Sequence, residues 1–403
     1  PRLIPMIQID NSRTPPAFAL FELGFRPFFS AAGLFAVITM LVWMLMYIFS
    51  KQLPLSGLYQ SGWHAHEMIY GYAMAAVAGF LLTAVGNWTG IPGLRGAALV
   101  SLFALWLVAR IAWFIPGEFS LPLAAAADGL FTLGLIVGVS LPVIRVRQWT
   151  QLGIISKLWL ILAANGLFYA GVLGYSEQGE RWGLYSGLYM ILALVFVMAR
   201  RVLPFFIERG VDEACSSNNR LWIDITSLVL FLVWATLDVF TQQATVIAWL
   251  SLGLFAVHAW RLFDWHTPGI WRKPLLWSLY LGYASLTLGF LLKALSIWQG
   301  LSSSLALHTF AVGGIGLMTI GMMSRVALGH TGRDVFNPPA ILAPMFMLVI
   351  IATITRVVLP LVDPAHYTIW IATSQVFWIL GFALFSAVYI PQLVRPRVDG
   401  RPG

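Results

Sequence analysis

Long apolar segments recur along the chain, separated by short stretches that are polar or contain Pro and Gly. An α-helix of about 20 apolar residues spans the hydrocarbon core of a bilayer. The pattern therefore predicts an all-α, polytopic transmembrane helix bundle with about twelve spans. The predicted spans are residues 28–49, 64–85, 94–115, 121–143, 154–175, 183–203, 221–241, 244–262, 275–297, 303–327, 338–360 and 366–391.

The composition excludes a water-soluble fold. Of the 403 residues, 59% are hydrophobic and only 10% are charged, whereas a soluble domain has about 25% charged residues. The first apolar segment is too long for the core of a signal peptide, and no small-residue cleavage site follows it, so we expect a retained span. We expect one integral-membrane domain over residues 1–403. The polar stretch 208–220 would divide it into possible halves, 1–207 and 221–403, which share no motif.

The basic residues indicate the orientation of the bundle, because Lys and Arg concentrate in the cytoplasmic loops of membrane proteins. All but five of the 24 Lys and Arg residues fall in the N-terminus, the even-numbered loops, the C-terminus or the adjoining helix ends. The five exceptions are Lys51, Arg110, Arg181, Lys293 and Arg356. Both termini are therefore predicted to be cytoplasmic. The basic residues form no long run, so the net charge of +8 indicates topology and not nucleic acid binding.

The second segment opens with two histidines and a glutamate, His64, His66 and Glu67. Ionisable residues inside a membrane segment indicate function by default. On a regular helix His64 and Glu67 share a face and His66 points elsewhere, so one helix cannot present all three to one ion. A second helix must then supply ligands, and His308 lies at a similar depth in the tenth segment.

These residue types suit a metal. Neutral imidazole binds copper, zinc and haem iron, and one or two histidines commonly hold a haem. The single cysteine, Cys215, excludes a thiolate cluster within one chain. His64, His66 and His308 satisfy these requirements by residue type and depth, with Glu67 beside them. The alternative is that these histidines only cap helix ends and form hydrogen bonds at the membrane interface.

A second group of histidines lies towards the cytoplasmic side. His258 is near the end of the eighth segment, and His330 follows the tenth. His308 and His330 are 22 residues apart, which as helix spans roughly 33 Å, so the two groups predict two separate sites. Arg325 and Arg333 flank His330 and could bind carboxylates such as haem propionates. An ordinary basic loop with a solvated histidine is the alternative. The remaining histidines, His266 and His366, are assigned to loops without function.

The charges of Arg110 and Asp128 have a structural explanation, and the common catalytic motifs are missing. Arg110 and Asp128 fall in the third and fourth segments, and we expect them to pair because each needs a partner inside the membrane. The chain has no P-loop, GxSxG or HExxH motif, so nucleotide chemistry and standard hydrolysis have no support.

Four motifs in order resemble the NnrS family. They are FELGFRPFF at residues 21–29, WHAHEM at 63–68, GFLLTAVGNWTG at 79–90, and the stretch 308–333 that ends in GHTGR. The resemblance implies a bacterial inner-membrane protein that contains haem b and copper and is linked to denitrification and resistance to nitrosative stress. Nitric oxide would be its small-molecule ligand. The resemblance implies no settled reaction.

The resemblance also implies particular residues. The family's histidines would be His64, His66, His308 and His330, and the polar companions Glu67, Asn87, Arg26, Arg325 and Arg333. In the ninth segment the family's Leu-His-x-Gly-Tyr pattern leads us to expect a histidine, but this chain has Tyr280 there. This departure argues against a ligand role at that position. From the resemblance we predict that His64 and His308 ligate haem and that His66 and Glu67 ligate or orient a second metal.

Three other functions compete with this hypothesis. A redox enzyme akin to haem-copper oxidases would need a dense histidine set, and no adjacent His-His pair exists. A transporter would use the ionisable residues as a substrate or proton path. A structural assembly protein would need none of the histidines.

Overall fold

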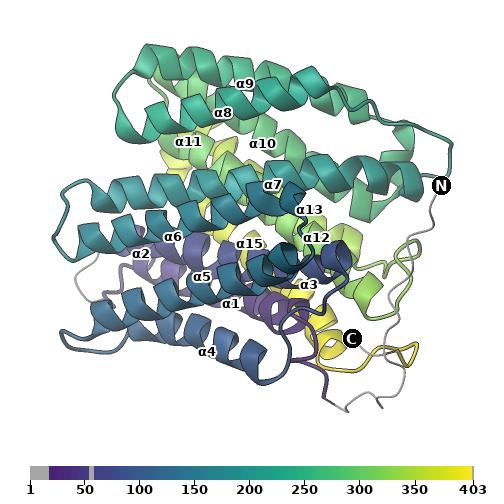
Figure 1. Cartoon of the computed structure of the whole chain (residues 1–403). Helices are drawn as coiled ribbons and strands as arrows, with labels where there is room; N and C mark the ends of the chain where they lie inside the picture. The colour runs from purple at the N-terminus through teal and green to yellow at the C-terminus, as the bar shows by residue number, and fades with distance from the viewer. Residues whose placement is uncertain (1–17, 54–58, 402–403) are drawn as a thin grey trace.

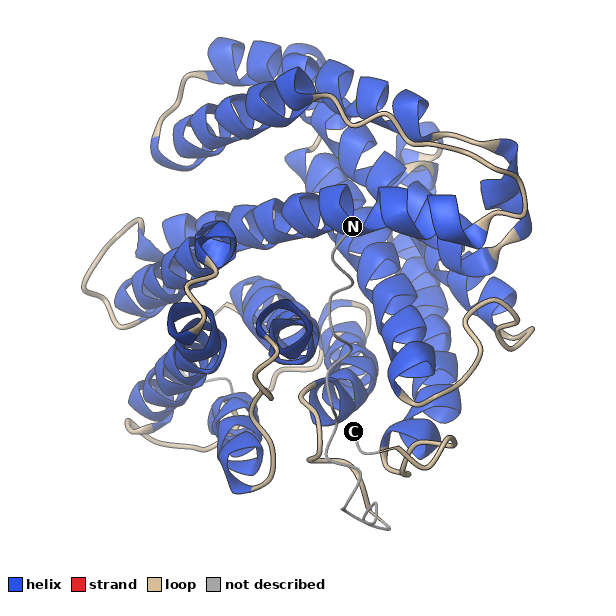
Figure 2. Cartoon of the chain, turned by 45° about the vertical axis from the view of Figure 1, so that its right-hand side comes forward, coloured by secondary structure: helices blue, strands red, loops and turns tan. Residues whose placement is uncertain are grey.

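The computed structural model describes residues 18–53 and 59–401, and within these ranges it contains helices and turns but no strand. The helices lie side by side, with the linkers gathered at the two ends of the bundle (Figure 1). Figure 2 shows the same helical architecture from a second direction. The all-α prediction is therefore confirmed.

Two spans are built from three consecutive helical pieces. The first is α2 (Gln60–His66), the π-helix η1 (Glu67–Ala73) and α3 (Met74–Thr89); the second is α11 (Ser303–His308), the π-helix η4 (Thr309–Gly316) and α12 (Leu317–His330). The other spans are α1 (Phe25–Tyr47), α4 (Ala97–Ala112), α5 (Ser120–Arg145), α6 (Leu152–Val172), α7 (Gly179–Gly210), α8 (Leu221–Phe240), α9 (Ala244–Trp265), α10 (Pro274–Gln299), α13 (Leu342–Val357) with α14 (Leu359–Val362), and α15 (Tyr367–Leu393). Short 3-10 turns, η2 (Trp149–Gln151), η3 (Pro268–Arg272) and η5 (Pro364–His366), precede α6, α10 and α15.

All twelve predicted spans coincide with helical segments of the described chain. Eleven of them are long and apolar enough to cross a membrane. The exception is α4, which has 16 residues and is therefore roughly 24 Å long. The protein is a multi-pass membrane protein.

The linkers of the bundle differ strongly in charge. One end, here called the basic face, comprises residues 18–24, 90–96, 146–151, 211–220, 266–273, 331–341 and 394–401. Its described linkers carry nine Lys and Arg residues, whereas those of the opposite face carry Lys51 alone. The predicted cytoplasmic side is the basic face.

Glycines allow helices to approach closely at several crossings. A Cβ on Gly79 would lie 2.7 Å from the ring of Phe29, and one on Gly316 would lie 2.6 Å from the ring of Trp378. Neighbouring side chains thus fill the surface that these glycines leave. This supports the packing role of small residues in membrane helices.

Candidate functional site

The change from α-helix to π-helix after His66 decides how the second span presents its polar groups. Nδ1 of His66 lies 2.9 Å from Oε1 of Glu67, so these two neighbours point into one cluster. The ring of His64 instead stacks on that of Trp43 in α1, with centroids 4.5 Å apart and planes 7° apart. The expectation that His64 and Glu67 share a face is therefore wrong, because the chain is not regular α-helix at this point.

His66 and Glu67 belong to a group of buried polar residues, here called the carboxylate cluster. Its members come from α2, η1, α4, α5 and α6: His66, Glu67, Arg110, Asp128, Asn165 and Tyr169. Arg110 donates to Glu67 at 2.7 Å and also to Asp128, which confirms the predicted pair. Tyr169 donates to the other oxygen of Asp128 at 2.7 Å.

The carboxylate cluster is almost free of solvent, and Arg110 pairs with both of its carboxylates. His66 and Asp128 are 0% and 1% exposed. Nε2 of His66 lies 3.1 Å from the amide oxygen of Asn165, so both ring nitrogens have polar partners. Arg110 lies between Glu67 and Asp128 and donates to each. Buried charges need such pairing, because an unpaired charge in this environment costs several kcal/mol.

His308 lies in a second group, here called the histidine cluster. It comprises His64, His308, Trp43, Ser304 and Arg356, from α1, α2, α11 and α13. Nδ1 of His308 lies 2.7 Å from the carbonyl oxygen of Ser304, so the N–H at Nδ1 donates to it. The lone pair of the neutral ring is therefore on Nε2, which accepts a hydrogen bond from Nη2 of Arg356 at 3.2 Å.

His64 and His308 come from distant parts of the sequence, and both lie near Arg356. Arg356 contacts Nε2 of His308 directly, and it is close enough to His64 for its charge to act on that imidazole. Nδ1 of His64 is buried and has no hydrogen-bond partner among the described residues. Nη1 of Arg356 is likewise buried without a partner in the described chain.

These two histidines fit a metal-bound group by their chemistry. A ring whose Nδ1–H is fixed by a backbone carbonyl and whose Nε2 carries the lone pair has the usual geometry of a histidine ligand. His308 has this geometry, and Arg356 would have to move aside for ligation. His64 contributes a buried nitrogen without a partner. No group of three His, Cys, Asp or Glu side chains in the described ranges is arranged to hold a metal by itself.

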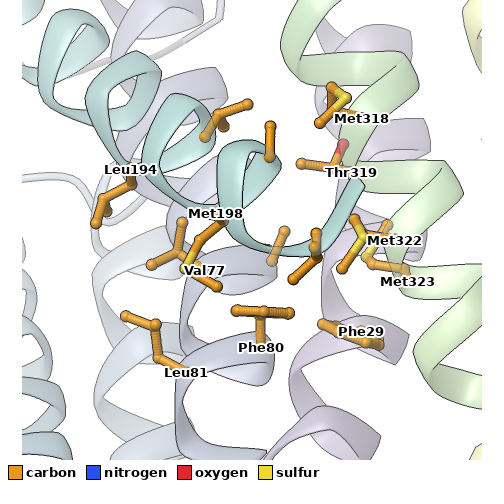
Figure 3. Close-up of a pocket in the computed structure, with 14 residues that line it drawn as sticks. Phe29, Val77, Phe80, Leu81, Leu194, Met198, Met318, Thr319, Met322 and Met323 are labelled. Atoms are coloured by element: carbon orange, nitrogen blue, oxygen red, sulfur yellow. The ribbon is translucent and has the colours of Figure 1, made fainter. Parts of the chain in front are cut away.

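An apolar cavity of about 80 Å³ lies between α1, α3, α7 and α12. Figure 3 shows that its lining is almost entirely carbon and sulfur, with Met198, Met318 and Met322 among the residues around it. A smaller cavity of about 40 Å³ lies between η1, α7 and η4. Each π-helix of the two histidine-bearing spans thus lines an apolar space.

The order of the motifs, the membrane architecture and the histidine-bearing spans can be compared with known protein families. Residues 19–397 match the family described as "NnrS protein". The chain belongs to the NnrS family. The match covers both polar clusters and the helix ends at the basic face. A comparison with curated proteins gives no match.

The residues that the NnrS resemblance selects at the basic face do not join the histidine cluster. The ring of His330 packs on Phe25 at 5.5 Å, and its carbonyl oxygen accepts from Arg397. Arg325 lies over the ring of Phe206 at 3.8 Å. Burial and the nearby Arg395 lower the pKa of Arg333. A cofactor role for His330, Arg325 and Arg333 stays a prediction.

His258 lies in a third setting, between α7, α9 and α10. Its ring stacks on Phe196 at 4.3 Å, and its Nδ1 lies 2.6 Å from the hydroxyl of Tyr283. Tyr280, which occupies the position where the NnrS pattern led us to expect histidine, donates to the carbonyl of Leu262 at 3.0 Å. That hydroxyl therefore serves helix packing between α9 and α10.

Sequence reasoning missed Asn165 and Tyr169 in the carboxylate cluster and Trp43 in the histidine cluster. Asn165 could have been found, because an amide in the middle of an apolar segment needs a buried partner. Tyr169 and Trp43 gave no such signal, since aromatic residues near span ends are explained by the membrane interface. Arg356 was noted as an intramembrane charge, but its contact with His308 depends on how α11 and α13 pack.

Proposed function

We propose that this NnrS-family protein binds haem b and copper in the inner membrane of bacteria and binds nitric oxide at a histidine-ligated metal, as part of the response to nitrosative stress. The observation that carries the proposal is that His64 and His308, from two distant spans, both lie near Arg356 and are partly buried. Family membership supports the connection with nitric oxide.

Ser304, Trp43 and Arg356 each have a different role in this proposal. Ser304 fixes the orientation of His308, so that Nε2 is the ligating atom. Trp43 holds the plane of the His64 ring by stacking. When bound, haem iron or copper would supply an open coordination position for nitric oxide. Arg356 would leave Nε2 of His308 and offer its guanidinium to an anionic group of the cofactor.

Copper is assigned to His66 and Glu67, as the sequence suggested. In the described structure both nitrogens of His66 already have partners, Glu67 and Asn165. Ligation would therefore require Asn165 to give up its contact with Nε2. Nε2 of His66 would then exchange the oxygen of Asn165 for the metal, and no charge of the carboxylate cluster would become exposed to lipid.

The apolar cavities suit access by nitric oxide. The molecule is small and uncharged, so it dissolves in the hydrocarbon core and needs no polar pathway. The cavity in Figure 3 is lined by Phe29, Val77, Met198 and other apolar side chains. Thr319, at the edge of this cavity, is hydrogen-bonded to Tyr72, which lines the smaller cavity nearer the histidine-bearing ends of the spans.

The proposal is tested by absorbance spectra and metal analysis of detergent-purified protein. We expect a Soret band that is lost or strongly reduced in His64→Ala and in His308→Ala. His366→Ala is the matched control, because its ring is exposed on the opposite face. A Soret band that survives both substitutions would contradict the assignment, as would protein without haem or copper after expression with both supplied.

A transporter is the second candidate, favoured by the carboxylate cluster. Glu67, Arg110 and Asp128 form a buried ionisable network inside the membrane, and such networks form proton paths in transporters. This candidate predicts colourless protein and proton-coupled uptake in proteoliposomes that Glu67→Gln abolishes. Colourless protein with such uptake would favour it over metal binding.

A further inference from the structure

A third cavity, of about 210 Å³, lies near the basic face between α6, α7, α8 and α9. We call it the basic pocket. Its charged and polar lining residues are Lys157, Arg200, Arg201, Asp224, Ser227, His258 and Arg261. Four of these side chains are cationic and one is a carboxylate, so the pocket has an excess of three positive charges.

The single carboxylate of the basic pocket is already shared. Both Arg200 and Arg261 donate to Asp224, at 2.8 and 2.7 Å. Arg201 donates to the side chain of Gln151, and Lys157 donates to a backbone carbonyl in its own helix. Neither of these two cations has a carboxylate partner in the described residues. An anion entering the pocket would therefore meet positive charge that is not neutralised.

A chain of hydrogen bonds sets the proton of His258. Arg261 can only donate, so the hydroxyl oxygen of Tyr283 accepts from its Nη1 at 3.2 Å. The hydroxyl proton of Tyr283 is then free to donate to Nδ1 of His258, 2.6 Å away. The neutral ring consequently carries its proton on Nε2.

Nε2 of His258 is buried and has no hydrogen-bond partner in the described chain. The residue is 1% exposed and lines the basic pocket. An unpartnered buried donor costs free energy unless a ligand or water accepts from it. The pocket lining thus combines an unpartnered N–H donor with guanidinium groups, a set that suits an oxyanion rather than a metal.

The apolar residues that line the basic pocket indicate which class of anion it binds. From Arg200 the wall runs along α7 to Val197 and Ala193, and from Asp224 it runs along α8 to Leu228 and Phe231. Both runs lead away from the basic face towards the middle of the membrane. The cavity is therefore cationic at one end and apolar at the other, as the two parts of a membrane lipid require.

We propose that the basic pocket binds a phosphate group, and that an anionic phospholipid supplies it, with the headgroup at Arg201, Lys157 and His258 and an acyl chain along α7 and α8. Free phosphate offers the same oxygen acceptors to the same donors. It lacks the apolar part that would use the wall at Leu228. The site is separate from the proposed haem and copper ligands in the other half of the membrane.

The test measures binding of defined lipids to the full-length protein in detergent by native mass spectrometry. We expect phosphatidylglycerol to bind more tightly than phosphatidylcholine. Arg201→Gln combined with Lys157→Gln should weaken phosphatidylglycerol binding roughly tenfold or more, because hydrogen bonds to charged groups are the strong ones. Arg209→Gln is the matched control, since Arg209 lies on the same helix but contacts the ring of Phe205 outside the pocket.

Competition with inorganic phosphate distinguishes the two possible sources of the bound phosphate group, a phospholipid headgroup and free phosphate. If it displaces phosphatidylglycerol from the wild-type protein only at high concentration, the lipid is the ligand. If phosphate alone binds as tightly and in the same Arg201-dependent manner, the phosphate site stands and the lipid assignment is overturned. Equal binding of both lipids to wild type and to the double variant would overturn the site. Loss of bound metal in His258→Leu would overturn it in favour of metal ligation.

Discussion

His66 and Glu67 are consecutive residues whose side chains are hydrogen-bonded to each other, Nδ1 to Oε1, at 2.9 Å. In a regular α-helix consecutive side chains diverge by about 100° around the axis. Here the second residue begins a π-helical segment. Such segments occur frequently at functional sites, and the same change follows His308 in the tenth span. The two spans that contain a π-helix thus both change helix type directly after a histidine.

The first prediction concerns the charge of Glu67. Glu67→Gln removes one of the two carboxylates that neutralise Arg110 in a nearly solvent-free environment. Breaking a buried ion pair on one side costs about 3–5 kcal/mol. We expect a large fall in the unfolding temperature of the detergent-solubilised protein, measured by tryptophan fluorescence. Glu177→Gln, at an exposed position of the opposite face, is the control. Equal unfolding temperatures for the two variants would show that the cluster does not carry this charge pairing.

The second prediction concerns the contact between α6 and α7. A Cβ on Gly183 would lie 2.4 Å from the backbone nitrogen of Phe168, so the two helices would have to separate. Gly183→Ala should therefore destabilise the protein by about 1–3 kcal/mol. The separation would also move Asn165 and Tyr169 away from His66, so we expect loss of copper along with stability.

Gly166→Ala provides the comparison for this contact. It lies on the same helix, α6, and a Cβ there meets nothing within 4 Å. We expect wild-type stability or a slight gain, because Ala favours helix over Gly. If both alanine variants retain wild-type unfolding temperature and copper content, the close approach of α6 and α7 is not required.

The third prediction tests orientation through the one native cysteine. Cys215 lies in the linker between α7 and α8 at the basic face, partly buried. A membrane-impermeant maleimide should label it only after cells are permeabilised, since the basic face is predicted to be cytoplasmic. In a Cys215→Ser background, Glu177→Cys on the opposite face should be labelled in intact cells. The reverse pattern would invert the predicted topology.

The rate at which a maleimide labels Cys215 should depend on pH. Burial, followed by the carboxylates of Glu208 and Glu213, raises the pKa of Cys215 above its ordinary value. The thiolate is the reactive form, so labelling should be slow at neutral pH and should increase until the pH exceeds that raised pKa. Glu213→Gln should shift the rate profile to lower pH, because it removes a negative charge that disfavours the thiolate. A profile centred at the value of a free cysteine, unchanged by this substitution, would contradict the described surroundings.

The spans could be predicted from the sequence because the thickness of the hydrocarbon core fixes how many consecutive apolar residues a helix needs. The ends of the spans were predicted less accurately than their positions along the chain. The predicted span 183–203 is part of a longer helix, Gly179–Gly210, because a helix can continue beyond the hydrocarbon core into polar residues such as Glu208 and Arg209. The predicted span 94–115 contains a helix of only 16 residues.

The candidate site was predicted in part. Arg110 and Asp128 could be paired in advance because two opposite charges in neighbouring spans have few other partners. The pairing of His66 with Glu67 agrees with the hydrogen bond between them. The expectation that His64 shares a face with Glu67 was wrong, because it assumed a regular helix through a segment that becomes π-helical at Glu67. No Pro marks this change of helix type.

The sequence by itself determined that this is a multi-pass helical membrane protein with a basic face, since hydrophobic length and charge position act locally along the chain. Only the tertiary structure decided which polar side chains meet. The contact of Arg356 with His308 and that of His66 with Asn165 join residues 48 and 99 positions apart. Such partners are chosen by how helices pack and rotate against each other, and the buried polar groups accept whichever partners that packing brings within hydrogen-bond distance.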